Sequence, residues 1–168
     1  MTAGVNLFRL ENLMKNLVIG QSGGPTAVIN ASLYGAVKAF RESGTDGHVL
    51  GMINGIEGFL ADHVMDLSTD LSEEELELLK LTPAAYLGSC RYKLPADLES
   101  EVYPAIFDNF REMNIGYFLY VGGNDSMDTV DKLSRYAEKI GSDVKFIGIP
   151  KTIDNDLVLT DHTPGFGS

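Results

Sequence analysis

The chain has 168 residues, and its 24 acidic side chains outnumber its 13 basic ones, which gives a formal net charge of −11. Apolar residues make up 44% of the chain, enough to bury a sizeable core, so the composition excludes a disordered tail. A chain this acidic is repelled by nucleic-acid phosphates and anionic membrane surfaces, which excludes both as general partners.

The length fits one domain, and the ends of the chain can be interpreted separately. Residues 1–13 contain neither a basic region nor a long apolar block, so they are not a secretory signal and are interpreted as an extension of unknown role. A domain is expected over residues 14–168. Cys90 is the single cysteine, so no internal disulfide can form and a cytoplasmic location is expected.

In chain order, short apolar segments alternate with segments of helical periodicity. The apolar segments predict strands over Leu17–Gly20, His48–Ile53, His63–Leu67, Tyr117–Val121 and Val144–Ile149. Helices are predicted over Thr26–Ser43, after the capping-box pair Ser72 and Glu75, from Val102 to Met113 and from Val130 to Ile140. Three of the strands are almost continuously apolar, as in parallel sheets that are covered on both faces. The sequence therefore predicts an α/β fold, with an open, mostly parallel sheet and helices on both faces.

The segment Gly20-Gln-Ser-Gly-Gly-Pro-Thr26 joins the first predicted strand to the first predicted helix. Glycines let backbone N–H groups approach an anion, and a helix N-terminus adds partial positive charge. The spacing matches neither the Walker motif nor the dinucleotide fingerprint. Two interpretations stay open at this point: a phosphate cradle at Gly23 and Gly24, or a tight turn that requires glycine.

A second glycine turn, Val121-Gly-Gly-Asn-Asp-Ser126, also follows a strand and precedes a helix. Open parallel sheets bind ligands beyond the carboxyl ends of their strands, so the two turns are expected to share one crevice. Asp125 would repel a phosphate there unless a metal or a lysine lies between them. The alternative is that Asn124, Asp125 and Ser126 only cap the helix.

The segment Ile149-Pro-Lys-Thr-Ile-Asp-Asn-Asp156 follows the last predicted strand. Asp154 and Asp156 are two residues apart in a loop and can point into one site, where one of them could act as a general base. Lys151 supplies a cation close by. The alternative is an exposed polar loop without a function.

One further loop, Leu87-Gly-Ser-Cys-Arg91, ends in an arginine. An isolated arginine is usually solvated, with its stem lying along apolar surface. In a loop after glycine and serine, Arg91 could instead hold phosphate oxygens with its fork of donors.

Together these four segments resemble the phosphofructokinases, most closely the pyrophosphate-dependent 6-phosphofructokinases. The segments stand in the family order, and the resemblance extends from Met14 to Ser168. It implies the Rossmann-like N-terminal domain of that family, which binds the phosphoryl donor. The implied enzyme transfers a phosphoryl group from pyrophosphate to the 1-hydroxyl of fructose 6-phosphate, a step of glycolysis and gluconeogenesis.

The resemblance also implies roles for the residues of the four segments. The first aspartate of the Thr-Ile-Asp segment takes the proton from the attacking hydroxyl, and this falls on Asp154. Lys151 and Asp125 complete the expected catalytic set. Thr152 and Asp156 would position the substrate. The residues expected to bind the donor are Gly23, Gly24, Arg91, Gly123 and Ser126.

Two positions bear on which donor is used. ATP-using bacterial relatives typically carry Gly-Gly-Asp-Gly-Ser, and Asp125 stands where a glycine leaves room for the nucleotide. Lys151 stands where those relatives often carry glycine, and a lysine there can neutralise the leaving phosphate. Both positions favour pyrophosphate. An ATP-dependent 6-phosphofructokinase stays the alternative, and a non-catalytic phosphate-binding fragment is the alternative from another class.

The resemblance implies Mg²⁺, although the family's Mg²⁺-binding aspartate is replaced here by Asn124, a weaker ligand. Family members are much longer than this chain. Their second half holds fructose 6-phosphate, partly with residues of a neighbouring subunit. Residues 14–168 are therefore expected to lack the substrate half and to belong to a homo-oligomer.

Overall fold

Five strands form one open sheet in the structure of residues 15–167, which is a computed structural model. The strands are β1 (Asn16–Gln21), β2 (Val49–Met52), β3 (Val64–Asp66), β4 (Ile115–Gly122) and β5 (Lys145–Pro150), in the spatial order β3-β2-β1-β4-β5. Neighbouring strands are parallel except for β3, which pairs antiparallel with β2. The five predicted strands and the mostly parallel sheet are confirmed. The interpretation of residues 1–13 as an extension lies outside the described residues.

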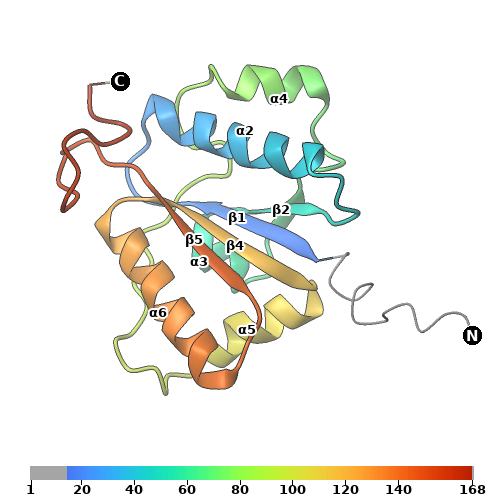
Figure 1. The fold of residues 1–168 in the computed structure, drawn as a ribbon, viewed down its shortest axis with the longest axis vertical. Helices are drawn as coiled ribbons and strands as arrows, with labels where there is room; N and C mark the ends of the chain where they lie inside the picture. The colour runs from blue at the N-terminus through green and yellow to red at the C-terminus, as the bar shows by residue number, and fades with distance from the viewer. Residues whose placement is uncertain (1–14, 168) are drawn as a thin grey trace, which may run out of the picture.

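The helices cover both faces of this sheet, as predicted (Figure 1). Helices α2 (Ala27–Glu42) and α4 (Glu73–Leu79) lie on one face. On the other face lie α3 (Gly55–Phe59), α5 (Val102–Glu112) and α6 (Asn124–Ile140). Within residues 15–167, no helix combines the length and the apolar character needed to cross a membrane.

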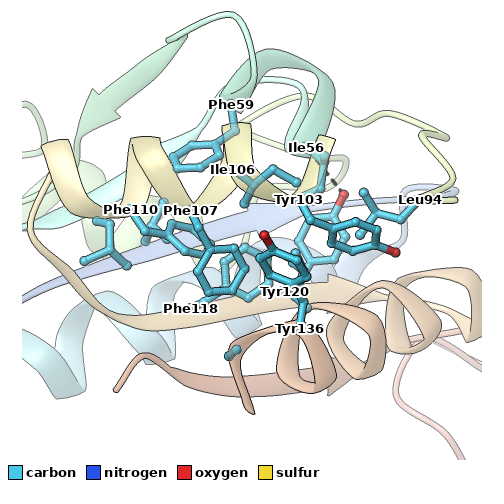
Figure 2. Packing of buried hydrophobic residues seen from close by; sticks show 14 of the residues in the cluster. Ile56, Phe59, Leu94, Tyr103, Ile106, Phe107, Phe110, Phe118, Tyr120 and Tyr136 are labelled. Carbon is cyan, nitrogen blue, oxygen red and sulfur yellow. Dashed lines mark hydrogen bonds between the residues drawn. The ribbon is translucent and has the colours of Figure 1, made fainter. Parts of the chain in front are cut away.

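The inner strands are buried from both sides, which explains their almost continuous apolar sequence. Side chains alternate between the two faces of a strand, so Val18 and Phe118 face α5 and α6. Their neighbours Ile19 and Leu119 face α2 and α4. Aromatic rings dominate the first of these layers (Figure 2). For example, the ring centroids of Phe110 and Phe118 are 5.6 Å apart.

Helix α3 has no counterpart among the predicted elements. It spans only five residues, which is too short for a period of 3.6 to be recognised. The chain enters it through Asn54 and Gly55, which both have positive φ values (59° and 62°). A Cβ atom on Gly55 would lie 2.8 Å from the Cys90 Sγ atom, so the position requires glycine both for its φ angle and for space.

The predicted capping box at the start of α4 is confirmed. The Ser72 hydroxyl accepts a hydrogen bond from the Glu75 N–H (3.2 Å), and the Glu75 carboxylate accepts one from the Ser72 N–H (2.9 Å). The hydrogen bonds from Ser72 lower the pKa of Glu75 below its ordinary value. A lowered carboxyl pKa means that this contribution to stability is present above the ordinary pKa and is lost as the pH falls through the lowered value.

We therefore expect Ser72→Ala to lower the free energy of unfolding by about 1 kcal/mol at pH 7, the usual cost of removing an N-cap side chain. Urea denaturation measures this difference, which should become smaller in acid as Glu75 is protonated. Glu74→Ala is the matched control, because Glu74 is exposed in the same helical turn and is not part of the box. An equal loss in both variants would contradict the capping role.

Candidate active site

An open cavity of about 440 Å³ lies at the carboxyl ends of β1, β4 and β5. All the site residues predicted from the sequence line it: Gly23, Gly24, Arg91, Gly123, Asn124, Asp125, Ser126, Lys151, Thr152, Asp154 and Asp156. These residues come from four segments that lie far apart in the sequence. In Figure 1, the segment after β5 lies beside the first turns of α2 and α6. The parallel topology brings the four segments together, because the carboxyl ends of parallel strands share one edge of the sheet.

The first glycine turn is both a tight turn and a wall of the cavity. Gly23 has a φ angle of 78°, which favours glycine. Its N–H donates to the Cys90 carbonyl (3.3 Å), and its carbonyl accepts from the Ser89 hydroxyl (2.6 Å). The expectation that the backbone N–H groups of this turn face an anion therefore needs a correction at Gly23, whose amide is paired within the protein.

Lys151 brings a positive charge to this turn from the end of β5. The residue is only 3% exposed, and its ammonium group donates to the Gly24 carbonyl. A Cβ atom on Gly23 would lie 3.8 Å from the Lys151 Nζ atom, so the ammonium group lies beside this turn, and both residues line the cavity. Burial disfavours the charged form and lowers the pKa of Lys151. An anion in the cavity would relieve that cost, because it would pair with the ammonium group.

Asp125 faces the same cavity and has a basic partner that the sequence analysis missed. The Lys93 Nζ atom lies 3.4 Å from the Asp125 Oδ1 atom, and the two side chains are 71% and 83% exposed. An ion pair this exposed adds little to stability. Lys93 nevertheless places a lysine beside Asp125, the kind of partner that the sequence analysis required for a carboxylate next to a phosphate. The signal was present in the sequence, because Arg91 and Lys93 are two residues apart in an extended loop and can point to one side.

The polar residues at the start of α6 do not cap the helix. The N-cap is Gly123, and no side chain makes a cap hydrogen bond there. Instead the Asn124 side chain donates across the cavity to the Asp156 carboxylate (2.9 Å). The interpretation of Asn124, Asp125 and Ser126 as helix caps is therefore wrong. The buried Ser126 leaves no room for a side chain at Gly122, where a Cβ atom would lie 2.0 Å from the Ser126 hydroxyl.

The loop after β5 is held by its own hydrogen bonds. The Thr152 hydroxyl donates to the Asp156 carboxylate (2.7 Å) and accepts from the Asp154 N–H (3.2 Å). Asp156 thus receives hydrogen bonds on both carboxylate oxygens, one from Thr152 and one from Asn124. Asp154 is exposed on the cavity wall. Asp156 therefore links the loop after β5 to the start of α6, and Asp154 stays exposed beside it.

The oxygen atoms of Asp154 and Asn124 on the cavity fit a Mg²⁺ ion whose other ligands are phosphate oxygens and water. Within residues 15–167, no group of three or more His, Cys, Asp or Glu side chains could hold a metal ion by itself. Mg²⁺ prefers oxygen ligands and is commonly held by one or two carboxylates together with substrate phosphates and water. The Asp154 carboxylate and the Asn124 amide oxygen, both on the cavity, match that donor set.

The family model for phosphofructokinase matches residues 16–168. The chain belongs to the phosphofructokinase family. This phosphofructokinase chain is 46% identical over 156 residues to the pyrophosphate–fructose 6-phosphate 1-phosphotransferase of Halomonas elongata, covering 91% of the chain and 37% of that protein. It also matches the crystal structure of a pyrophosphate-dependent phosphofructokinase from Nitrosospira multiformis with a TM-score of 0.85 and 42% identity, over 92% of the chain and 38% of that structure.

A relative with a different donor in its name is less similar. The ATP-dependent 6-phosphofructokinase of Clostridium acetobutylicum is 30% identical, over 91% of the chain and 44% of that protein. The chain therefore spans less than half the length of each of these relatives. The Rossmann-like phosphofructokinase fold expected from the sequence is confirmed.

Proposed function

We propose that residues 14–168 are the donor-binding part of a longer pyrophosphate–fructose 6-phosphate 1-phosphotransferase. The observation that carries this proposal is the meeting of Asp125 and Lys151 in one cavity with Gly23 and Asp154. A buried lysine favours a small anion beside the glycine turn, and an exposed carboxylate disfavours the larger triphosphate of a nucleotide. The greater similarity to relatives named for pyrophosphate supports the same choice of donor.

In the proposed reaction, the Asp154 carboxylate takes the proton of the fructose 6-phosphate 1-hydroxyl. The hydroxyl oxygen then forms a bond to the nearer phosphorus atom of pyrophosphate, and the bond from that phosphorus to the bridging oxygen breaks. Fructose 1,6-bisphosphate and phosphate are released. Lys151 neutralises charge on the leaving phosphate, and Arg91 binds phosphate oxygens with its fork of donors. Thr152 and Asp156 keep the Asp154 loop in place.

The proposal also includes a metal ion, the activity expected of this chain by itself, and the assembly of the longer protein. Mg²⁺, where bound at Asp154 and Asn124, would supply positive charge to the phosphate oxygens. Since the chain spans 37% of the Halomonas elongata relative, we propose that residues 14–168 bind pyrophosphate alone but do not turn it over. The longer protein is proposed to be a cytoplasmic homo-oligomer. Calorimetry with pyrophosphate and an activity assay on the same sample separate binding from turnover.

The choice of donor leads to a direct prediction. Asp125→Gly should raise kcat/KM for ATP in the full-length enzyme by about tenfold or more, because it removes a like charge from the path of the triphosphate. Steady-state kinetics with ATP and with pyrophosphate measure the change.

Two further variants separate charge from size and location. Asp125→Asn keeps the size of the side chain and should give part of the gain in ATP use. Asp131→Asn is the matched control, because Asp131 is also an exposed carboxylate of α6 but lies outside the cavity. ATP use that stays unchanged in Asp125→Gly, or that rises equally in Asp131→Asn, would reject the role of Asp125.

A further inference from the structure

Two buried amide side chains lie behind the cavity and form a closed polar network. Gln21 at the end of β1 is fully buried, and Asn30 in α2 is 1% exposed. The Gln21 amide nitrogen donates to the Asn30 side-chain oxygen (3.0 Å) and to the Ile29 carbonyl (3.1 Å). Neither residue lines the cavity.

The other hydrogen bonds of this network hold the irregular loop that leads to Arg91. The Leu87 N–H donates to the Gln21 side-chain oxygen (3.0 Å), and the Tyr86 N–H donates to the Asn30 side-chain oxygen (2.8 Å). The Asn30 amide nitrogen donates to the Thr82 carbonyl (2.9 Å). The loop between α4 and α5 contains no helix, and the network fixes its backbone at three points.

The held loop then pairs with the first glycine turn. The Cys90 carbonyl accepts from the Ser22 hydroxyl (3.1 Å) and from the Gly23 N–H (3.3 Å). Ser22 and Cys90 also form an isolated parallel bridge. The register of this contact decides where Arg91 stands relative to Gly23, since Arg91 is the next residue along the loop.

The polar chemistry of the network indicates that it fixes the arrangement of the backbone. Burying polar groups costs free energy unless each is hydrogen-bonded, so apolar side chains would hold strand and helix together at less cost. Hydrogen bonds are directional, and a satisfied buried network specifies one arrangement of the backbone. Here that arrangement is the one that joins two walls of the cavity.

We propose that Gln21 and Asn30 are positioning residues of the donor site, which act by setting the register of the Arg91 loop against the Gly23 turn. The inference rests on the proposed function, because it assumes that Arg91 and the glycine turn bind a phosphoryl donor. It extends that function to two residues that touch neither donor nor substrate.

The first test compares two destabilising variants of the full-length enzyme. Asn30→Leu keeps the branched shape of the side chain and its number of heavy atoms but removes the bonds to the loop. It should raise KM for pyrophosphate by about 10- to 100-fold, the scale expected when a binding group is misplaced by about 1 Å. KM for fructose 6-phosphate should stay within about twofold. Val37→Ala is the matched control, because Val37 is fully buried on the same helix but belongs only to the apolar core. It should lower the thermal midpoint without changing either KM.

A second test asks whether the network acts through Arg91. Arg91→Ala should raise KM for pyrophosphate, and adding Asn30→Leu to it should raise KM little further, since the group that the network positions is already absent. Gln21→Met, which leaves both bonds from Asn30 to the loop, should give a smaller rise than Asn30→Leu. Effects of Asn30→Leu and Arg91→Ala that multiply independently would overturn the proposal.

Other results would also overturn the proposed positioning role of Gln21 and Asn30. An unchanged KM for pyrophosphate in folded Asn30→Leu and Gln21→Met would overturn the proposal, and so would failure of both variants to fold, because the network would then be structural. Should wild-type enzyme use ATP and not pyrophosphate, the proposed donor would be wrong. The same comparison made with KM for ATP would still test the network.

Discussion

Lys151→Met is expected to lower kcat/KM for pyrophosphate by about 100- to 1000-fold in the full-length enzyme, the usual cost of removing one preorganised group that stabilises charge in a transition state. The substitution keeps the long stem and removes the cation. Most of the loss should fall on kcat, because charge on the leaving phosphate is greatest in the transition state. Steady-state kinetics measure the effect.

The pH dependence of pyrophosphate binding by the wild-type enzyme should report the titration of Lys151. Burial lowers the pKa of Lys151 below its ordinary value of 10.5. The charged form is the one that holds phosphate, so affinity for pyrophosphate should be full below the lowered pKa and should fall as the pH rises through it. Pyrophosphate bound to the ammonium group raises that pKa again, so the fall should move to higher pH at saturating donor. In Lys151→Arg, the affinity for pyrophosphate should no longer fall in this pH range, because arginine stays charged.

Lys145→Met is the matched control for this prediction. Lys145 is exposed at the start of the same strand and lies outside the cavity. Its variant should keep kcat/KM within about twofold, as expected for a surface substitution. A similar loss of activity in both lysine variants would show that the effect of Lys151 is not specific to the site.

The fold could be predicted because its pattern repeats along the chain. Apolar segments such as Tyr117–Val121 are bounded by glycine and polar residues and alternate with helical periodicity, which is the signature of a covered parallel sheet. Helix α3 escaped prediction because its geometry depends on left-handed backbone at Asn54 and Gly55. Nothing in the local sequence distinguishes such a short turn of helix from a loop.

The site could be predicted as a set of segments but not as a set of contacts. Four motifs that follow strands must meet at one edge of a parallel sheet, so the membership of the cavity follows from topology. Which partners meet within it depends on side-chain positions from distant segments. The pairs Lys93–Asp125 and Asn124–Asp156 join residues more than 30 positions apart. The spacing of Arg91 and Lys93 can indicate that both face one side of the loop, but no local pattern identifies the partner of either pair.

Asp154→Asn should lower kcat by about 100- to 10,000-fold, the range expected for loss of a general base. The amide keeps the size of the carboxylate but cannot take the proton of the attacking hydroxyl. Asp154 is exposed on the cavity wall, and its side chain makes no hydrogen bond or ion pair with any of residues 15–167. The variant should therefore fold normally and bind pyrophosphate within a few-fold of wild type. Calorimetry measures the binding, and the coupled assay measures kcat.

Comparing the forward and reverse reactions provides a control for the assignment of Asp154 as the general base. A catalyst cannot change an equilibrium constant, and the group that accepts the proton in one direction must return it in the other. The losses in kcat/KM for the forward and reverse reactions should therefore match. Asp161→Asn, an exposed aspartate of the same segment that lies outside the cavity, should leave both directions unchanged. Retention of kcat in Asp154→Asn would mean that another group takes the proton, and Asp156, already bonded to Thr152 and Asn124, would be the next residue to test.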